Sequence, residues 1–297
     1  MDEPWAQDVE RVTRALGVEP AAWHEAAGHG APSNRRWIVR LPSHHSADVL
    51  VFVKVAAFDY TADWLRAEHA TYEALDGLAF LPRLLGWDDD GEHPVLAIES
   101  FADAAWPPPW SPEGVGSVRR ALEEVHAQPP PEHVHPMEHW RQQLMSWGSV
   151  ADDPVPVLRL ELCSAQWLDD ALPVLLEAER EAPLDGESLL HMDVRSDNLC
   201  LEADRAVFVD WNHAARGNPQ VDLAAWLPSL EAEGGPRPEE LFPDCPNELA
   251  AILAGYFLSR APMEPIPQAP QVRELQLAQA RTALPWAARL LGLPPPG

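Results

Sequence analysis

The fold is decided by residues 188–227, which read SLLHMDVRSDNLCLEADRAVFVDWNHAARGNPQVDLAAWL. Two short apolar runs, residues 199–201 and 206–209, are separated by a polar turn, a pattern typical of a β-hairpin. In a hairpin, the residue before the first strand lies beside the residue after the second. Asn198 and Asp210 are therefore predicted to meet at one end of this hairpin.

A second acidic residue lies a short loop away. Asp193 precedes Asn198 by five residues and follows His191 by two. Carboxylate and amide oxygens suit Mg²⁺, which takes one or two protein ligands together with substrate phosphates. The remaining carboxylate, Asp193, can accept the proton of a hydroxyl nucleophile. Together these groups fit phosphoryl transfer, although a chance hairpin flanked by acids in an acidic chain is the alternative.

The motif H-x-D-x-x-x-x-N, followed by a hairpin and Asp-Trp-Asn, resembles the loops of a known family. These are the catalytic and metal-binding loops of aminoglycoside phosphotransferases and related small-molecule kinases of the protein-kinase-like fold. The later residues 217–219 (GNP) and 222–224 (DLA) extend the resemblance. It implies a bilobal α+β fold, with a small β-rich N-terminal lobe and a mainly helical C-terminal lobe, that uses ATP and Mg²⁺.

The resemblance also implies a role for each residue of the stretch. Asp193 would be the catalytic base, and Asn198 and Asp210 would hold Mg²⁺. His191 would brace the loop, and Asp222 would accept hydrogen bonds from the catalytic-loop backbone.

Composition narrows the class of protein. The chain has 297 residues, 46% of them hydrophobic, which is enough for two lobes with buried cores. Its net charge of −26 offers no obvious basic footprint for nucleic acid. The charge would favour a cationic small substrate, or it serves only to keep the protein soluble. The acidic first residues lack the apolar region of a secretory signal, and no apolar run is long enough to span a bilayer. The three cysteines have no paired spacing, which is typical of a reducing compartment. We therefore expect a cytoplasmic protein.

Only one of the 21 basic residues is a lysine, Lys54. It lies in the apolar run VLVFVKV, which predicts a buried strand where an ammonium group needs an anion. Glu68 falls on the apolar stripe of the helix predicted over residues 61–78. We therefore expect a Lys54–Glu68 ion pair, with Lys54 also reaching nucleotide phosphates as the resemblance implies. The alternative for Glu68 is an acid on the helix surface.

A loop of small residues precedes the strand of Lys54. Residues 26–34 read AAGHGAPSN, which does not match the P-loop motif. The loop is either an ordinary hairpin connection or, by resemblance, the loop that positions the nucleotide. In the second case Gly28, Gly30, Ser33 and Asn34 are candidate contacts.

The chain changes character after Phe101, where a connector rich in Pro and Trp begins. We expect a nucleotide-binding lobe over residues 1–102 and a catalytic and acceptor-binding lobe over 103–297. By resemblance, the backbone from Glu99 to Phe101 would hydrogen-bond the adenine edge. Trp106 and Trp110 could stack on a ligand, but wall packing is the favoured role.

Further candidates lie in the second lobe. Arg195 stands two residues after Asp193, where a basic residue would contact the transferred phosphoryl group, or it pairs with the nearby Asp197 or Asp204. Met192 replaces the small residue usual in the family between His and Asp, so we expect altered packing behind the loop and no change of ligand. Trp211 and Asn212 follow Asp210 without a Gly, so we expect a metal loop that does not switch. Five acids that could meet a cationic acceptor are Glu231, Glu233, Glu239, Glu240 and Asp244.

The sequence thus predicts an ATP- and Mg²⁺-dependent phosphotransferase acting on a hydroxyl of a small molecule. An aminoglycoside-type antibiotic leads as the acceptor, which would make the protein a resistance enzyme, and another hydroxylated metabolite is the alternative. A nucleotide-binding module without turnover and a metal-dependent phosphohydrolase are hypotheses of other classes. The second of these lacks the His-rich ligand set that such sites often use.

Overall fold

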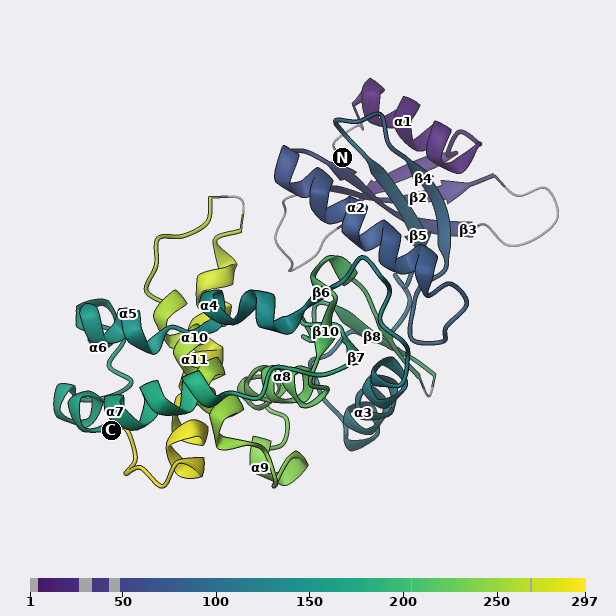
Figure 1. The fold of residues 1–297 in the computed structure, drawn as a ribbon. Helices are drawn as coiled ribbons and strands as arrows, with labels where there is room; N and C mark the ends of the chain where they lie inside the picture. The colour runs from purple at the N-terminus through teal and green to yellow at the C-terminus, as the bar shows by residue number, and fades with distance from the viewer. Residues whose placement is uncertain (1–4, 27–33, 43–48, 204, 268) are drawn as a thin grey trace. The chain divides into compact units, whose positions relative to one another are not determined.

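The computed structural model describes residues 5–26, 34–42, 49–203, 205–267 and 269–297 (Figure 1). The chain forms two compact units. The first unit comprises residues 1–107, 131–133 and 197–214, and the second comprises residues 108–130, 134–196 and 215–297. The chain therefore passes from the second unit into the first between Ser196 and Asp197, and it returns after Ala214.

A five-stranded sheet of order β1-β2-β3-β5-β4 organises the first unit, and its neighbouring strands pair antiparallel (Figure 1). The strands are β1 (Ala22–Glu25), β2 (Asn34–Leu41), β3 (Val49–Ala56), β4 (Leu84–Asp88) and β5 (Val95–Glu99). Two helices accompany the sheet, α1 (Ala6–Leu16) and α2 (Asp59–Ala74).

The two faces of the sheet are covered by different helices. Successive side chains of a strand point to opposite faces. Val51, Val53 and Val55 of β3 share a buried cluster with Val12 of α1, whereas Lys54, between them, contacts Glu68 of α2. Helix α1 therefore covers one face and α2 covers the other.

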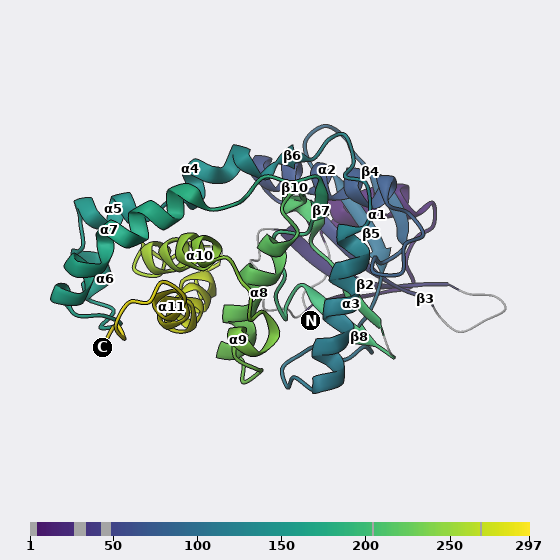
Figure 2. The ribbon, with the colours of Figure 1, turned by 60° about the horizontal axis from the view of Figure 1, so that its bottom comes forward.

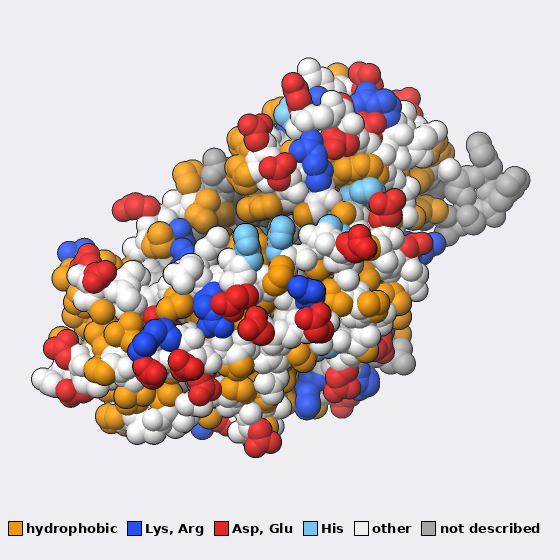
Figure 3. All heavy atoms as spheres, viewed as in Figure 1, with side chains coloured by type: hydrophobic (Ala, Val, Ile, Leu, Met, Phe, Trp, Pro, Cys, Tyr) orange, Lys and Arg blue, Asp and Glu red, His pale blue; other side chains and the backbone are white. Residues whose placement is uncertain are grey.

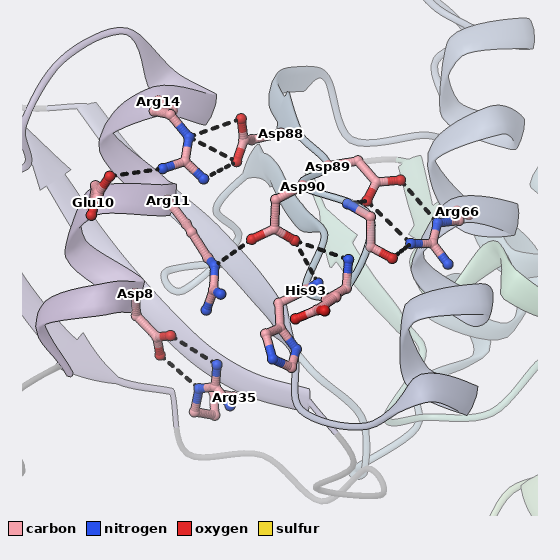
Figure 4. Close-up of polar contacts among 12 residues, drawn as sticks. Asp8, Glu10, Arg11, Arg14, Arg35, Arg66, Asp88, Asp89, Asp90 and His93 are labelled. Atoms are coloured by element: carbon pink, nitrogen blue, oxygen red, sulfur yellow. Dashed lines mark hydrogen bonds and ion pairs between the residues drawn. The ribbon is translucent and has the colours of Figure 1, made fainter.

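Arginine–aspartate pairs fasten α1 and α2 to the turn between β4 and β5, and another joins α1 to β2 (Figure 4). Burial raises the pKa of Asp90, but the N–H groups of His93 and Glu92 and the Arg11 guanidinium outweigh it and lower that pKa to about 2. The pairs are Arg11–Asp90 (2.9 Å), Arg14–Asp88 (2.8 Å), Arg66–Asp89 (2.9 Å) and Arg35–Asp8 (2.6 Å).

Gly86 on β4 permits the close approach of α1. A Cβ atom at this position would lie 2.3 Å from the carbonyl oxygen of Ala15. No side chain fits at that distance, so a larger residue would force α1 away from the sheet.

The hairpin predicted around residues 199–209 is present as β8 (Leu199–Glu202) and β9 (Arg205–Phe208). It belongs to the first unit, where Cys200 and Val207 pack against Phe101. The Phe208 N–H donates to the carbonyl of Phe80 at 2.8 Å. The hairpin is thereby attached to the segment that follows β5 and to the segment that precedes β4.

Helices dominate the second unit, and α10 and α11 lie side by side with α7 and α8 packed against them (Figures 1 and 2). A small sheet of order β6-β10-β7 completes it. The helices are α3 (Pro112–His126), α4 (Arg141–Leu144), α5 (Trp147–Asp152), α6 (Val155–Leu158), α7 (Ala165–Glu181), α8 (Gln220–Ala232), α9 (Pro238–Leu241), α10 (Asn247–Arg260) and α11 (Gln271–Leu290), and the strands are β6 (His135–Pro136), β7 (Ser188–Leu190) and β10 (Ala215–Gly217). Two short 3-10 helices, η1 (Met137–Trp140) and η2 (Trp211–His213), follow β6 and β9.

The predicted α+β class, with a sheet in the N-terminal part and helices in the C-terminal part, is confirmed. The sequence also predicts a strand over residues 80–87, but residues 80–83 form a turn and an irregular segment, and β4 begins only at Leu84. The carbonyl of Phe80 accepts its hydrogen bond from β9 instead of from the sheet. The three cysteines are free and buried. Within the described residues, no helix is both long and apolar enough to cross a membrane.

Candidate functional site

Lys54 is the centre of a buried charge cluster in the first unit. Its side chain projects from β3 towards α2, and the residue is 5% exposed. The ammonium group donates to both carboxylate oxygens of Glu68, at 2.8 and 2.9 Å. It also forms an ion pair with Asp210, which follows the hairpin. The expected Lys54–Glu68 ion pair is therefore present, and it has a second acid as a partner.

One ammonium group thus lies between two carboxylates. The pKa values of Lys54 and Glu68 depend on both burial and these neighbouring charges. Burial lowers the pKa of Lys54, but the charges of Asp210 and Glu68 outweigh it and the net shift is upward. Burial raises the pKa of Glu68, Asp210 raises it further, and Lys54 opposes both. The cluster therefore holds a firmly protonated lysine and carries a formal excess of one negative charge.

The two candidate metal ligands, Asn198 and Asp210, flank the two strands at the same end of the hairpin, as the sequence predicted. Leu199 pairs with Phe208, and the Val209 N–H donates to the carbonyl of Asn198 at 2.9 Å. The next residue, Asp210, lies in the left-handed region at φ 64°. Its carboxylate and the Asn198 amide are hard oxygen donors, and with the excess negative charge beside them they fit a divalent cation such as Mg²⁺.

Of the four loop residues predicted to contact the nucleotide, the structure describes Asn34. Gly28, Gly30 and Ser33 lie outside the described residues. Asn34 is half-buried at the start of β2, where it pairs with Ala56 of β3. Its role towards a nucleotide stays a prediction.

Hydrogen bonds within the first unit hold the chain around the end of β5. The Glu99 N–H donates to the Arg83 carbonyl at 2.9 Å, and the Phe101 carbonyl accepts from the Ala104 N–H at 3.1 Å. That carbonyl also accepts from Trp106 Nε1 at 3.0 Å. A nucleotide would have to meet other backbone groups of this segment.

In the second unit, Asp222 holds the start of the catalytic loop. The carboxylate is fully buried and accepts the backbone N–H groups of His191 and Met192, each at 2.8 Å. His126, in the last turn of α3, lies with Nε2 at 3.1 Å from the same carboxylate. Asp222 thus makes the contact with the loop backbone that the family resemblance implies, and α3 supports it.

We expect Asp222→Ala to lower the free energy of unfolding by about 3 kcal/mol or more, because the buried N–H of His191 and the partly buried N–H of Met192 lose their acceptor. Urea unfolding at pH 7 measures this change. The exposed Asp185, in the segment before β7, provides the matched control Asp185→Ala, which should change stability by less than about 0.5 kcal/mol. A similarly small change for Asp222→Ala would contradict the structural role assigned here.

Three other residues of this loop, His191, Asp193 and Arg195, contact one another. The Nδ1 atom of fully buried His191 accepts the Asp193 N–H at 3.2 Å. The Asp193 carboxylate accepts a hydrogen bond from Arg195 Nη1 at 2.8 Å. The alternative partner Asp204 lies outside the described residues. His191 therefore shapes the turn before Asp193, and Arg195 contacts the candidate base itself.

Met192 occupies a backbone conformation that side chains disfavour. Its φ is 70°, in the left-handed region where glycine has no steric cost. This conformation lets the N–H groups of His191 and Met192 point at the same carboxylate, that of Asp222. The sequence indicated altered packing at Met192, and the structure shows that the backbone itself is affected.

Two residues of these clusters, buried Tyr72 and half-buried His126, were not candidates in the sequence. Tyr72 lies one helical turn after Glu68 on α2 and is 1% exposed. Burial first, and then the charges of Glu68 and Asp210, raise the pKa of its phenol well above the usual value. The sequence predicts a helix around His126 but indicates no role for its side chain. The i, i+4 spacing from Glu68 could have indicated Tyr72, whereas the contact of His126 with Asp222 spans 96 residues and leaves no local signal.

Comparisons with known proteins show the family and the fold of the chain. The model of the phosphotransferase enzyme family (APH) matches residues 28–275. No curated protein matches the chain significantly. Among solved structures, the chain resembles a thermostable mutant of aminoglycoside phosphotransferase APH(4)-Ia in its apo form, with 15% identity, a TM-score of 0.59 and coverage of 95% of this chain and 98% of that chain.

Two further solved structures are similar. A thermostable mutant of the same phosphotransferase in a ternary complex with AMP-PNP and hygromycin B has 14% identity and a TM-score of 0.60, covering 97% of this chain and 98% of that one. A choline/ethanolamine kinase family protein from Mesorhizobium loti has 15% identity and a TM-score of 0.51, covering 94% and 99%. These likenesses confirm the predicted kinase-like fold. Because the family model spans most of its length, the chain belongs to the phosphotransferase enzyme family (APH).

Proposed function

We propose that the protein transfers the γ-phosphoryl group of ATP to a hydroxyl of a small molecule, with Mg²⁺ as cofactor. The observation that carries the proposal is the buried cluster in which Lys54 bridges Glu68 and Asp210. A lone lysine kept protonated in this way is suited to nucleotide phosphates, and Glu68 fixes its position.

The remaining roles follow from the chemistry of each group. Asp193 orients the acceptor hydroxyl and takes its proton, while Arg195 is placed to stabilise charge on the transferred group. Asn198 and Asp210 would hold Mg²⁺, which when bound neutralises phosphate charge. We propose that backbone groups between Glu99 and Phe101, together with Ser33 and Asn34, contact the nucleotide.

We further propose a functional division at residue 102. Residues 1–102 would bind the nucleotide, and residues 103–297 would carry the catalytic loop and the acceptor site. Residues 197–214, which bear the candidate metal ligands, pack with the first unit. The metal ligands would therefore belong to the nucleotide-binding part of the chain. We also propose that the protein works in the cytoplasm.

For the acceptor, we propose an aminoglycoside-type antibiotic first, with another small hydroxylated metabolite as the alternative. The net charge of −26 favours a cationic compound, and a solved structure of similar fold holds hygromycin B. Acidic side chains are nevertheless spread over the viewed faces of both units, among arginines (Figure 3). The charge therefore supports a cationic acceptor without indicating where it binds.

The test is a coupled ADP-release assay with Mg·ATP and a panel of aminoglycosides, choline-like amino alcohols and neutral sugars. We expect release that depends on the acceptor and disappears when Mg²⁺ is chelated. Binding of Mg·ATP without turnover across the panel would favour a nucleotide-binding homologue. Hydrolysis without any acceptor would favour a phosphohydrolase, and failure to bind Mg·ATP would refute the proposed site.

A further inference from the structure

Helix α8 contacts the catalytic loop from both of its ends. At the first turn, Asp222 accepts the N–H groups of His191 and Met192. At the C-cap, Glu233 accepts a hydrogen bond from the side chain of Ser196 at 2.5 Å. Asp193 and Arg195 lie between these two points of attachment, so a single rigid element holds the loop on both sides of the proposed base.

Ser196 occupies a distinctive position in the chain. It is the last residue of the second unit before the chain enters the first unit at Asp197. Asn198, a proposed metal ligand, follows two residues later. A hydrogen bond at Ser196 therefore fixes the point at which the loop leaves the helical unit, and this point lies between the proposed base and the proposed metal ligand.

The carboxylate of Glu233 is itself held in place. Its second oxygen accepts a hydrogen bond from Trp110 Nε1 at 2.7 Å. The Trp110 ring packs against Trp226, with ring centroids 5.6 Å apart, and Trp226 is fully buried in α8. Trp110 precedes α3, so three segments that are distant in sequence meet at Glu233. A side chain fixed by two hydrogen bonds loses the rotamer freedom of an exposed glutamate.

Both donors to Glu233 are neutral groups, a hydroxyl and an indole N–H. Hydrogen bonds to a charged acceptor are stronger than those between neutral groups. The acid was a candidate for binding a cationic acceptor, but each of its two oxygens accepts a hydrogen bond within the protein. The geometry of Glu233 suits an anchor for the loop.

We propose that Glu233 is a positioning residue for the catalytic loop, which acts through Ser196 and is oriented by Trp110. Its effect on turnover rests on the proposed phosphotransfer. Its effect on the loop does not, because the hydrogen bonds exist whatever the reaction. The two can therefore be measured separately.

The first measurement is amide hydrogen exchange of residues 191–198 in the full chain, followed by mass spectrometry without nucleotide. In Ser196→Ala and in Glu233→Ala we expect exchange of this segment to be about tenfold faster, because a charge-assisted hydrogen bond is lost. The double variant should exchange no faster than either single variant, since both remove the same interaction. Trp110→Phe, which keeps an aromatic ring and removes the N–H donor, should show a smaller increase.

The second measurement is steady-state kinetics with the acceptor found in the ADP-release assay. We expect kcat to fall about tenfold in both single variants and no further in the double variant, while the Kd for Mg·ATP is unchanged. Glu233→Gln should retain most of the kcat of the natural protein. Its amide oxygen can accept from Trp110, and its amide nitrogen can donate to the Ser196 hydroxyl. A residue that only stabilised the fold would not show this rescue together with unchanged nucleotide affinity.

Glu177→Ala is the matched control, because Glu177 is an exposed acid of α7 that pairs with Arg180. It should leave both exchange and kcat unchanged. Exchange of residues 191–198 at the natural rate in both Ser196→Ala and Glu233→Ala would overturn the proposal, and so would additive losses of kcat in the double variant. If the natural protein transfers no phosphoryl group, the proposed function fails, and the exchange measurement still decides whether Glu233 anchors the loop.

Discussion

Asp193→Asn is expected to lower kcat for acceptor phosphorylation by about 10²- to 10⁴-fold, the range typical of a lost general base. Asparagine has nearly the same shape and can still accept a hydrogen bond from Arg195, which contacts Asp193 at 2.8 Å. It cannot take the proton of the acceptor hydroxyl. The loss should therefore appear in kcat, with the Kd for Mg·ATP changed little.

The kinetic constants and the nucleotide affinity should be measured on the same preparations. Asp185→Asn, at an exposed position, provides a control with the same chemical change and should retain the kcat of the natural protein. Natural turnover in Asp193→Asn would show that another group accepts the proton. A loss confined to the KM of the acceptor would show that Asp193 binds the acceptor without catalysing transfer.

Lys54→Met is expected to weaken Mg·ATP binding about 10- to 100-fold, because charge-assisted contacts to the phosphates are lost. It should also lower the free energy of unfolding by about 3–5 kcal/mol at neutral pH, because Glu68, which is 2% exposed, loses the ammonium group that offsets the burial of its carboxyl. Calorimetric titration with Mg·ATP and urea unfolding measure the two effects.

The loss of stability in Lys54→Met should depend on pH. The pKa of Glu68 is already raised by burial from its ordinary value of 4.5, and Lys54 is the group that opposes this rise. Without the lysine, the folded-state pKa rises further. A group with a raised folded pKa contributes its stability below the unfolded pKa and loses it as pH rises through the folded pKa. The difference from the natural protein should therefore be small near pH 4.5 and grow as the pH increases.

The double variant Lys54→Met/Glu68→Gln separates the two roles of the lysine. Glutamine removes the buried charge, so the double variant should regain much of the stability and lose the pH dependence. It should not regain affinity for Mg·ATP. If nucleotide affinity returned together with stability, Lys54 would act only by holding the fold, and its proposed contact with phosphate would be wrong.

Features encoded in short stretches of sequence were predictable. The alternation of apolar and polar residues indicated the strands, and the stripe on residues 61–78 indicated that Glu68 faces inward. The hairpin pattern predicted Asn198 beside Asp210, and in the structure Asn198 bonds Val209, the residue before Asp210. This was predictable because pairing in a two-stranded ribbon is local. The single lysine in a buried strand required an anion, and Glu68 supplies it.

The displaced start of β4 shows the limit of such patterns. The largely apolar residues 80–87 predict a strand, yet residues 80–83 form a turn and an irregular segment before β4. The backbone hydrogen bond that decides this comes from Phe208, far along the chain. Hydrophobic periodicity reports which residues are buried, but it does not report which segment supplies their hydrogen bonds.

The sequence by itself predicted the class of fold and the pairing of Lys54 with Glu68, and both are present in the structure. The chemical roles of the candidate site residues stay predictions. Only the tertiary structure decided that Asp210 shares this lysine across 156 residues, that His126 contacts Asp222, and that Glu233 accepts a hydrogen bond from Ser196. The physical reason is separation along the chain. Periodicity and turn chemistry act over a few residues, whereas contacts between distant side chains are set by how the packed elements bring them together.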